Sequence, residues 1–126
     1  MAEVKGDKKI KFVEISSMAE LNNDDDNVFL KITKNGCPPC RSLNKYLDTL
    51  TLNKQITIFC INISSGVSND VKEFINNNSI KSVPFLGFIE ITKNKEYKVI
   101  NQIRGFYDSN GNQKKEETLA FIERYE

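Results

Sequence analysis

The sequence predicts an α/β fold in which a mixed central β-sheet is flanked by helices on both faces. Apolar, β-branched runs alternate with segments whose apolar residues repeat every three or four positions, and two further strand-like runs form a hairpin near the end. The expected order is therefore β-α-β-α-β-α-β-β-α. A length of 126 residues, 39% of them hydrophobic, fits a single domain over 1–126 with one core.

The first half of the chain is expected to form two strands and two helices. One of these strands is almost wholly apolar and leads directly into a pair of cysteines, after which apolar residues lie on one helical face. The expected elements are an edge strand at 10–15, a brief helix capped by Ser16 or Ser17 and ending near Leu21, an acidic loop at 22–27, a buried strand at 28–32, and a helix at about 39–52.

The second half begins with ITIFCINI, a β-branched run that is apolar on both faces, as in an interior parallel strand. We expect this run to lie at the centre of the sheet. The remaining expected elements are a helix from Val67 to Ile75, ended by the cluster at 76–79, hairpin strands at 85–91 and 97–103, a charged loop, and a final helix with Leu119, Ile122 and Tyr125 on one side.

The charge balance argues against several classes of partner. With 18 basic and 17 acidic residues, the net charge of +1 gives no strong field for nucleic acid or an anionic membrane surface. No apolar stretch approaches the roughly 18 residues that a membrane span requires. The start, MAEVKGDKKIKFVEI, lacks the apolar core of a secretory signal. We therefore expect a cytoplasmic protein that binds neither nucleic acid nor membranes.

Cys37 and Cys40 form a CPPC motif at the predicted junction of the buried strand and the following helix. A cysteine at the N-cap accepts a backbone hydrogen bond, and the positive end of the helix favours its thiolate. Cys37 is therefore the candidate nucleophile. Cys40, one turn further along and more enclosed, is placed to attack a mixed disulfide formed at Cys37.

The two prolines between these cysteines change the N-terminus of the helix. Pro38 and Pro39 carry no N–H, so the amide of Cys40 becomes the main donor that faces the Cys37 sulfur. Pro39 also disfavours helical geometry at Pro38, which would delay the helix by one residue. The two prolines stiffen the loop between the cysteines, which should affect the reduction potential of the dithiol.

Two other interpretations of CPPC remain open. Cys37 and Cys40 could be buried cysteines that take part in no reaction, or they could supply half of the ligands of a zinc or iron-sulfur site. A zinc site within one chain needs two more ligands, and the sequence offers no histidine and only Cys60 as a further cysteine. The metal alternatives are a site of the three cysteines and one carboxylate, and a cluster shared between two chains with two cysteines from each.

The chain resembles the thioredoxin family. The resemblance rests on CPPC at a strand-to-helix junction, SVPF at 82–85, the whole order of elements, and Gly105 after the last strand. It implies a thioredoxin-like fold and a cis peptide bond between Val83 and Pro84 that presents the Val83 backbone to an extended substrate.

The resemblance also implies an activity. The protein would be a thiol-disulfide oxidoreductase that exchanges electrons with protein disulfides and acts as a reductant, with Cys37 attacking and Cys40 resolving. It would need no cofactor and no metal, and it would work as a monomer. Its partners would be protein disulfides and a reductase or another dithiol that returns it to the reduced form.

Three positions depart from the family pattern. Gly36 stands where thioredoxins usually carry tryptophan, Lys31 replaces a buried aspartate, and Cys60 takes the position of its lysine partner. The Lys31 amine could act on Cys40, but we favour a stem along the core with the amine in solvent. Cys60 is expected to be a small core residue rather than a third redox thiol, and Arg41 would add positive potential near the start of the helix.

Two further functions differ from the leading one. The fold could serve as a non-catalytic binding module, for which Lys31 and Gly36 are the best support. Glutaredoxins also place proline after the first cysteine, but their glycine pair and acidic residue after the cis-proline are missing here. The chain has Phe85-Leu86-Gly87-Phe88 instead, which disfavours glutathione binding.

Overall fold

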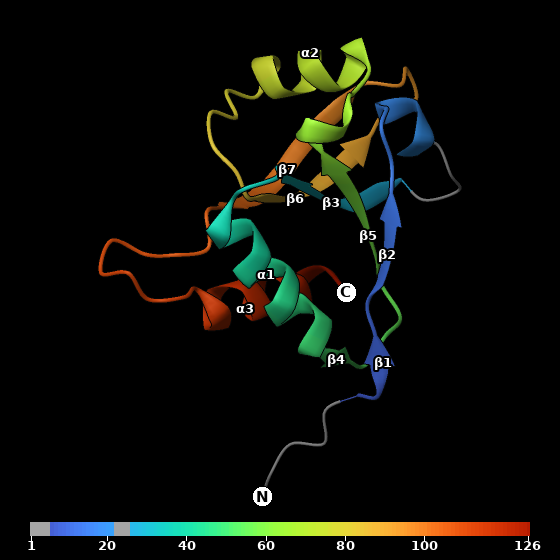
Figure 1. Cartoon of the computed structure of the whole chain (residues 1–126). Coiled ribbons are helices and arrows are strands. Elements are labelled where there is room, and N and C mark those ends of the chain that lie inside the picture. Colours follow the sequence, from blue (N-terminus) through green and yellow to red (C-terminus); the bar gives the residue numbers. More distant parts are fainter. Residues whose placement is uncertain (1–5, 22–25) are drawn as a thin grey trace, which may run out of the picture.

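The computed structural model describes residues 6–21 and 26–126 and shows a mixed five-stranded sheet with helices on both faces (Figure 1). The strand order is β2-β5-β3-β6-β7, in which β2 and β3 run parallel to β5 while β6 runs antiparallel to both β3 and β7. The strands span Lys11–Glu14 (β2), Asn27–Thr33 (β3), Thr57–Asn62 (β5), Phe85–Ile91 (β6) and Tyr97–Arg104 (β7). The predicted fold class is confirmed.

Three α-helices cover this sheet: α1 (Pro38–Thr49), α2 (Asn69–Asn77) and α3 (Lys115–Tyr125). In Figure 1, α2 lies on one face, whereas α1 and α3 lie on the other. None of the helices in the described ranges is both long and apolar enough to cross a membrane.

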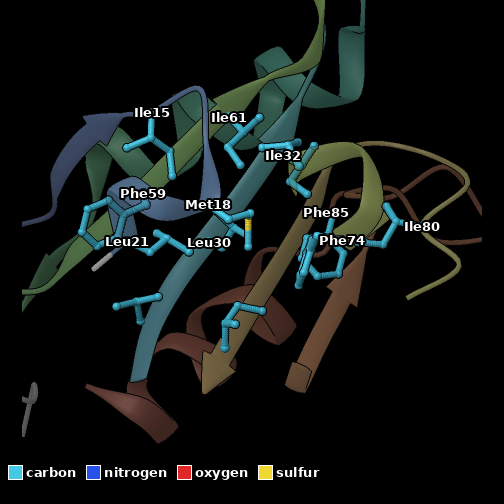
Figure 2. Close-up of a cluster of buried hydrophobic side chains, with 13 residues drawn as sticks. Ile15, Met18, Leu21, Leu30, Ile32, Phe59, Ile61, Phe74, Ile80 and Phe85 are labelled. Atoms are coloured by element: carbon cyan, nitrogen blue, oxygen red, sulfur yellow. The ribbon is translucent and has the colours of Figure 1, made fainter. Parts of the chain in front are cut away.

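The sheet separates two clusters of buried side chains. Strand β3 contributes to both, since Leu30 and Ile32 point toward α2 while Phe29 points toward α1 and α3. Figure 2 shows the cluster on the α2 face, where Met18, Phe74 and Phe85 pack around the residues of β3. A strand that is buried on both faces is typical of the middle of an α/β sheet.

The middle strand is β3, not β5 as the sequence indicated. Strand β5 is interior and parallel to its neighbours, as predicted, but the hairpin of β6 and β7 adds beside β3 and shifts the centre of the sheet. An apolar run shows that a strand is buried, but the position of that strand in the strand order depends on where the later strands pair.

Helix α1 ends at Thr49, three residues earlier than the prediction of 52. Leu50 is extended, with φ −77° and ψ 142°, and the next two residues form the short strand β4 (Thr51–Leu52). This strand pairs antiparallel with β1 (Lys8–Lys9), a separate short strand that precedes the predicted edge strand. Pairing with a distant segment therefore stops the helix, and helical periodicity does not report it.

The brief helix near Leu21 is present as the 3₁₀ helix η1 (Met18–Leu21). Its capping differs from the prediction, because the Glu20 carboxylate accepts the backbone N–H groups of Ser16 (2.8 Å) and Ser17 (3.0 Å). The Asp70 carboxylate of α2 also accepts the Met18 N–H, at 3.0 Å. The predicted acidic loop at 22–27 lies outside the described residues at 22–25, and Asn27 already belongs to β3.

Candidate active site

Gly36 turns the chain between β3 and α1. Its φ of +67° lies in the left-handed region, and a Cβ added there would meet no atom within 4 Å. The backbone conformation, not a lack of space, therefore favours glycine at this position. The turn is held by a hydrogen bond of 2.8 Å from the Asn62 side-chain amide to the Asn35 side-chain oxygen.

Cys37 is the N-cap of α1, as the sequence predicted. Its backbone is extended, with φ −117° and ψ 97°, and its Sγ accepts a hydrogen bond of 3.2 Å from the backbone N–H of Cys40. The predicted delay of the helix is wrong, because α1 begins at Pro38. Pro38 and Pro39 fill the first two helical positions, where the φ of proline fits and no N–H is required.

A disulfide joins Cys37 and Cys40, whose Cα atoms are 5.2 Å apart. The exposed fraction is 5% for Cys37 and 2% for Cys40, so the second cysteine is the more enclosed, as expected. Cys60 is the remaining free cysteine and lies half-buried in β5.

Val83 and Pro84 lie beside this disulfide, although they are more than 40 residues away in the sequence. The peptide bond between them is cis, as the resemblance implied. The Cys37 Sγ lies 3.9 Å from the carbonyl oxygen of Val83. The carbonyl oxygen of Pro84 accepts a hydrogen bond of 2.8 Å from the N–H of Gly105, which brings the end of β7 to the same place.

Arg104 supports this arrangement, and sequence reasoning missed it. Its guanidinium donates to the carbonyl oxygens of Asn78 (2.8 Å) and Ser79 (2.7 Å) at the end of α2. The segment between α2 and Pro84 is thus attached to β7 near both of its ends. Nothing in the sequence around Arg104 indicated that its side chain would reach the end of α2.

Lys31 lies under α1 and is only 5% exposed. Its ammonium donates a hydrogen bond to the Asn44 side-chain oxygen and lies 4.9 Å from the centroid of the Phe12 ring. The expectation that this amine reaches solvent is therefore wrong: α1 covers β3 here, and Asn44 supplies a hydrogen-bond acceptor within reach. Burial lowers the pKa of Lys31, although Cys60 and Glu14 oppose the shift.

The hydrogen bond of Lys31 goes to Asn44, which lies one helical turn after Cys40. Asn44 was missed, although a spacing of four residues from Cys40 places it on the same side of the helix. Cys60 pairs in register with Lys31 on the adjoining strand, and burial raises the pKa of its thiol. Arg41 is exposed at the start of α1, and its contribution to the local potential stays a prediction.

The loop after β7 lies against the first half of α1. Tyr107, which is 38% exposed, shares a hydrogen bond of 2.7 Å with the hydroxyl of Ser42. Within the described ranges, no group of three cysteine, aspartate, glutamate or histidine side chains is arranged to hold a metal ion.

Comparison with known proteins identifies the architecture. No family model matches the sequence, and no curated protein matches it. Among solved structures, thioredoxin from Plasmodium falciparum aligns with a TM-score of 0.61 and 16% identity over 98% of this chain and 93% of that one. The chain has the thioredoxin fold.

Two further solved structures of thioredoxins align with this chain in the same way. A mutant thioredoxin from Halobacterium salinarum gives a TM-score of 0.59 at 17% identity and covers 98% of this chain and 96% of its own. Schistosoma mansoni thioredoxin gives 0.62 at 12% identity, with coverage of 92% and 96%. The likeness extends along nearly the whole length of each chain, which confirms the fold that the resemblance implied.

Proposed function

We propose that the protein is a thiol-disulfide oxidoreductase that reduces protein disulfides through Cys37 and Cys40. The observation that carries this proposal is the Cys37–Cys40 disulfide at the start of α1. The Cys37 sulfur accepts a hydrogen bond from the Cys40 amide and lies beside the Val83 carbonyl. A dithiol in this place stores two electrons without a metal or an organic cofactor.

The reaction follows from the positions of the two sulfurs. In the dithiol form, the amide of Cys40 and the positive end of α1 stabilise the Cys37 thiolate, which attacks one sulfur of a substrate disulfide. A mixed disulfide forms, and the first substrate sulfur leaves as a thiolate. The Cys40 thiolate then attacks the Cys37 sulfur, which forms the Cys37–Cys40 disulfide and releases the second substrate sulfur. The substrate gains two electrons, and the dithiol loses them.

Val83 and Pro84 are proposed to bind the substrate. Val83 is half-buried next to the Cys37 sulfur, so its backbone can pair with an extended chain on either side of the substrate cysteine. The N–H of Gly105 donates a hydrogen bond to the carbonyl oxygen of Pro84 and so holds this residue in place. Recognition through the main chain tolerates different side chains, which suits a protein that acts on several disulfides.

Turnover requires an electron donor for the oxidised pair. A reductase or another dithiol would return Cys37 and Cys40 to the reduced form, and the reductant direction fits our expectation of a reducing, cytoplasmic location. The solved structures of the same fold are named thioredoxins, which supports this class of reaction for the present chain. We propose that the protein acts as a monomer.

Reduction of insulin disulfides with dithiothreitol as the donor tests the proposed function. We expect the wild-type protein to accelerate the reaction and Cys37→Ser to reduce its rate to that of dithiothreitol alone, because only Cys37 presents a sulfur at the N-cap. This variant keeps Cys40 and Cys60, so its remaining rate also reports any contribution from those two thiols. A wild-type rate equal to that of the variant would overturn the proposal and favour a non-catalytic binding module.

A further inference from the structure

A second group of reactive side chains lines a pocket of about 710 Å³ between the sheet and α1. Lys31 and Cys60 belong to its lining, together with Glu14 of β2 and Asn44 of α1. Lys31 is almost fully enclosed by the protein and lies on the wall of this pocket. The Cys37–Cys40 disulfide is not part of this lining.

The amine and the thiol are neighbours across two parallel strands. Lys31 of β3 pairs in register with Cys60 of β5, and both side chains lie on the face of the sheet that α1 covers. The Lys31 ammonium also contacts the Asn44 oxygen and the Phe12 ring, and these two contacts fix its position. Glu14 of β2 pairs in register with Cys60 on the other side of β5. Its negative charge raises the pKa of both Lys31 and Cys60.

The surroundings of this pair shift the pKa of each group toward its uncharged form. Burial lowers the pKa of Lys31, and the nearby Cys60 and Glu14 only partly oppose it. Burial raises the pKa of Cys60, against the effect of Lys31. A neutral amine is the nucleophilic form of lysine, and desolvation of a buried lysine is one way in which proteins activate it for imine formation.

We propose that Lys31 and Cys60 form a covalent binding site for small aldehydes. The Lys31 amine adds to the aldehyde carbon and loses one water, which gives an imine. The Cys60 sulfur then adds to the imine carbon while the thiol proton passes to nitrogen. The product is an N,S-acetal in which one carbon of the aldehyde bridges β3 and β5. One aldehyde enters and one water leaves, and no oxidant or reductant is consumed.

Formaldehyde is the probe, because it is small enough for the pocket and leaves a single methylene bridge. The protein is used in its disulfide form, in which Cys60 is the free thiol. After treatment near pH 7, intact mass and peptide mapping locate the added carbon. We expect the first equivalent to link Lys31 to Cys60 within one chain, ahead of the exposed Lys45 at the rim of the pocket.

Four variants separate the two steps of this reaction. Cys60→Ser should lose the bridge and keep an imine at Lys31 that only borohydride reduction makes stable. Lys31→Arg and Lys31→Met should lose both products, and their circular dichroism shows whether each is folded. Lys45→Arg is the matched control and should keep the bridge.

Labelling of Lys45 and other exposed lysines before Lys31 would overturn the proposal. So would a bridge that forms only after unfolding in urea, or Cys60 labelling that persists in folded Lys31→Met. The test does not use the Cys37–Cys40 reaction, so its outcome is independent of the proposed disulfide reductase activity.

Discussion

Cys40→Ser is expected to trap the protein on its substrate as a stable mixed disulfide at Cys37. Cys37 keeps its N-cap position in this variant, so the first attack still occurs, but the sulfur that releases the substrate is gone. We expect turnover to fall by at least about 100-fold, because an oriented intramolecular group reacts at an effective concentration far above that of a free thiol. Non-reducing electrophoresis of the variant with a disulfide-containing protein detects the adduct.

The matched control for this trap is the double variant in which Cys37→Ser is added to Cys40→Ser. It keeps Cys60, and we expect no adduct, because the free thiol that remains lies in β5 and is half-buried. An adduct of equal yield in the double variant would mean that Cys60, not Cys37, is the reacting sulfur.

Lys31→Met is expected to raise the free energy of unfolding at pH 7. Lys31 buries an ammonium that donates to a neutral amide oxygen and faces an aromatic ring, and the nearby Cys60 and Glu14 offset the cost of burial only in part. Methionine has a similar length without the charge. Replacing a buried ion pair with apolar side chains of similar volume can stabilise a protein by about 1–4 kcal/mol, and we expect a gain at the lower end of this range for the single charge of Lys31. The exposed Asn44 amide can hydrate after the change. Urea unfolding of both proteins measures the difference.

The gain from Lys31→Met should shrink as the pH rises. The pKa of Lys31 is lower in the folded protein than the unfolded value of about 10.4, so the unfolded chain binds more protons between these two values. The contribution of Lys31 to the free energy of unfolding of the wild-type protein therefore rises with pH between these two pKa values, whereas methionine does not titrate. Both proteins should carry Cys60→Ala, so that the thiol does not contribute. A difference that is constant from neutral pH to about pH 10 would show that the Lys31 charge is not the cause.

Local sequence patterns predicted most of the fold and the centre of the site. The N-cap role of Cys37 and the Cys40 amide donor follow from the position of CPPC between an apolar strand and an amphipathic helix. Each depends on residues that are close in sequence, where capping and periodicity are informative. The pairing of Val83-Pro84 with this motif came from the family resemblance and agrees with the structure.

Most of the errors concern contacts between distant segments. Lys31 was expected in solvent because a strand pattern does not show which helix residue will face its amine, and Asn44 supplies that contact. The early end of α1 depends on β1, which pairs with β4 from more than 40 positions away. Propensity yields to tertiary pairing at such places. The start of α1 at Pro38 is a local error, in which the fit of proline to the first turn prevailed over its effect on the preceding residue.

The reduction potential of the Cys37–Cys40 pair tests the central claim most directly. The protein is equilibrated with dithiothreitol buffers of known ratio, and alkylation followed by mass spectrometry measures the fraction of dithiol, with Cys60 as an internal thiol that stays outside the couple. A protein that donates electrons to disulfides should show one two-electron transition near about −270 mV, as thioredoxin does. A transition near about −120 mV, typical of a strong oxidant, would contradict the proposed reductant.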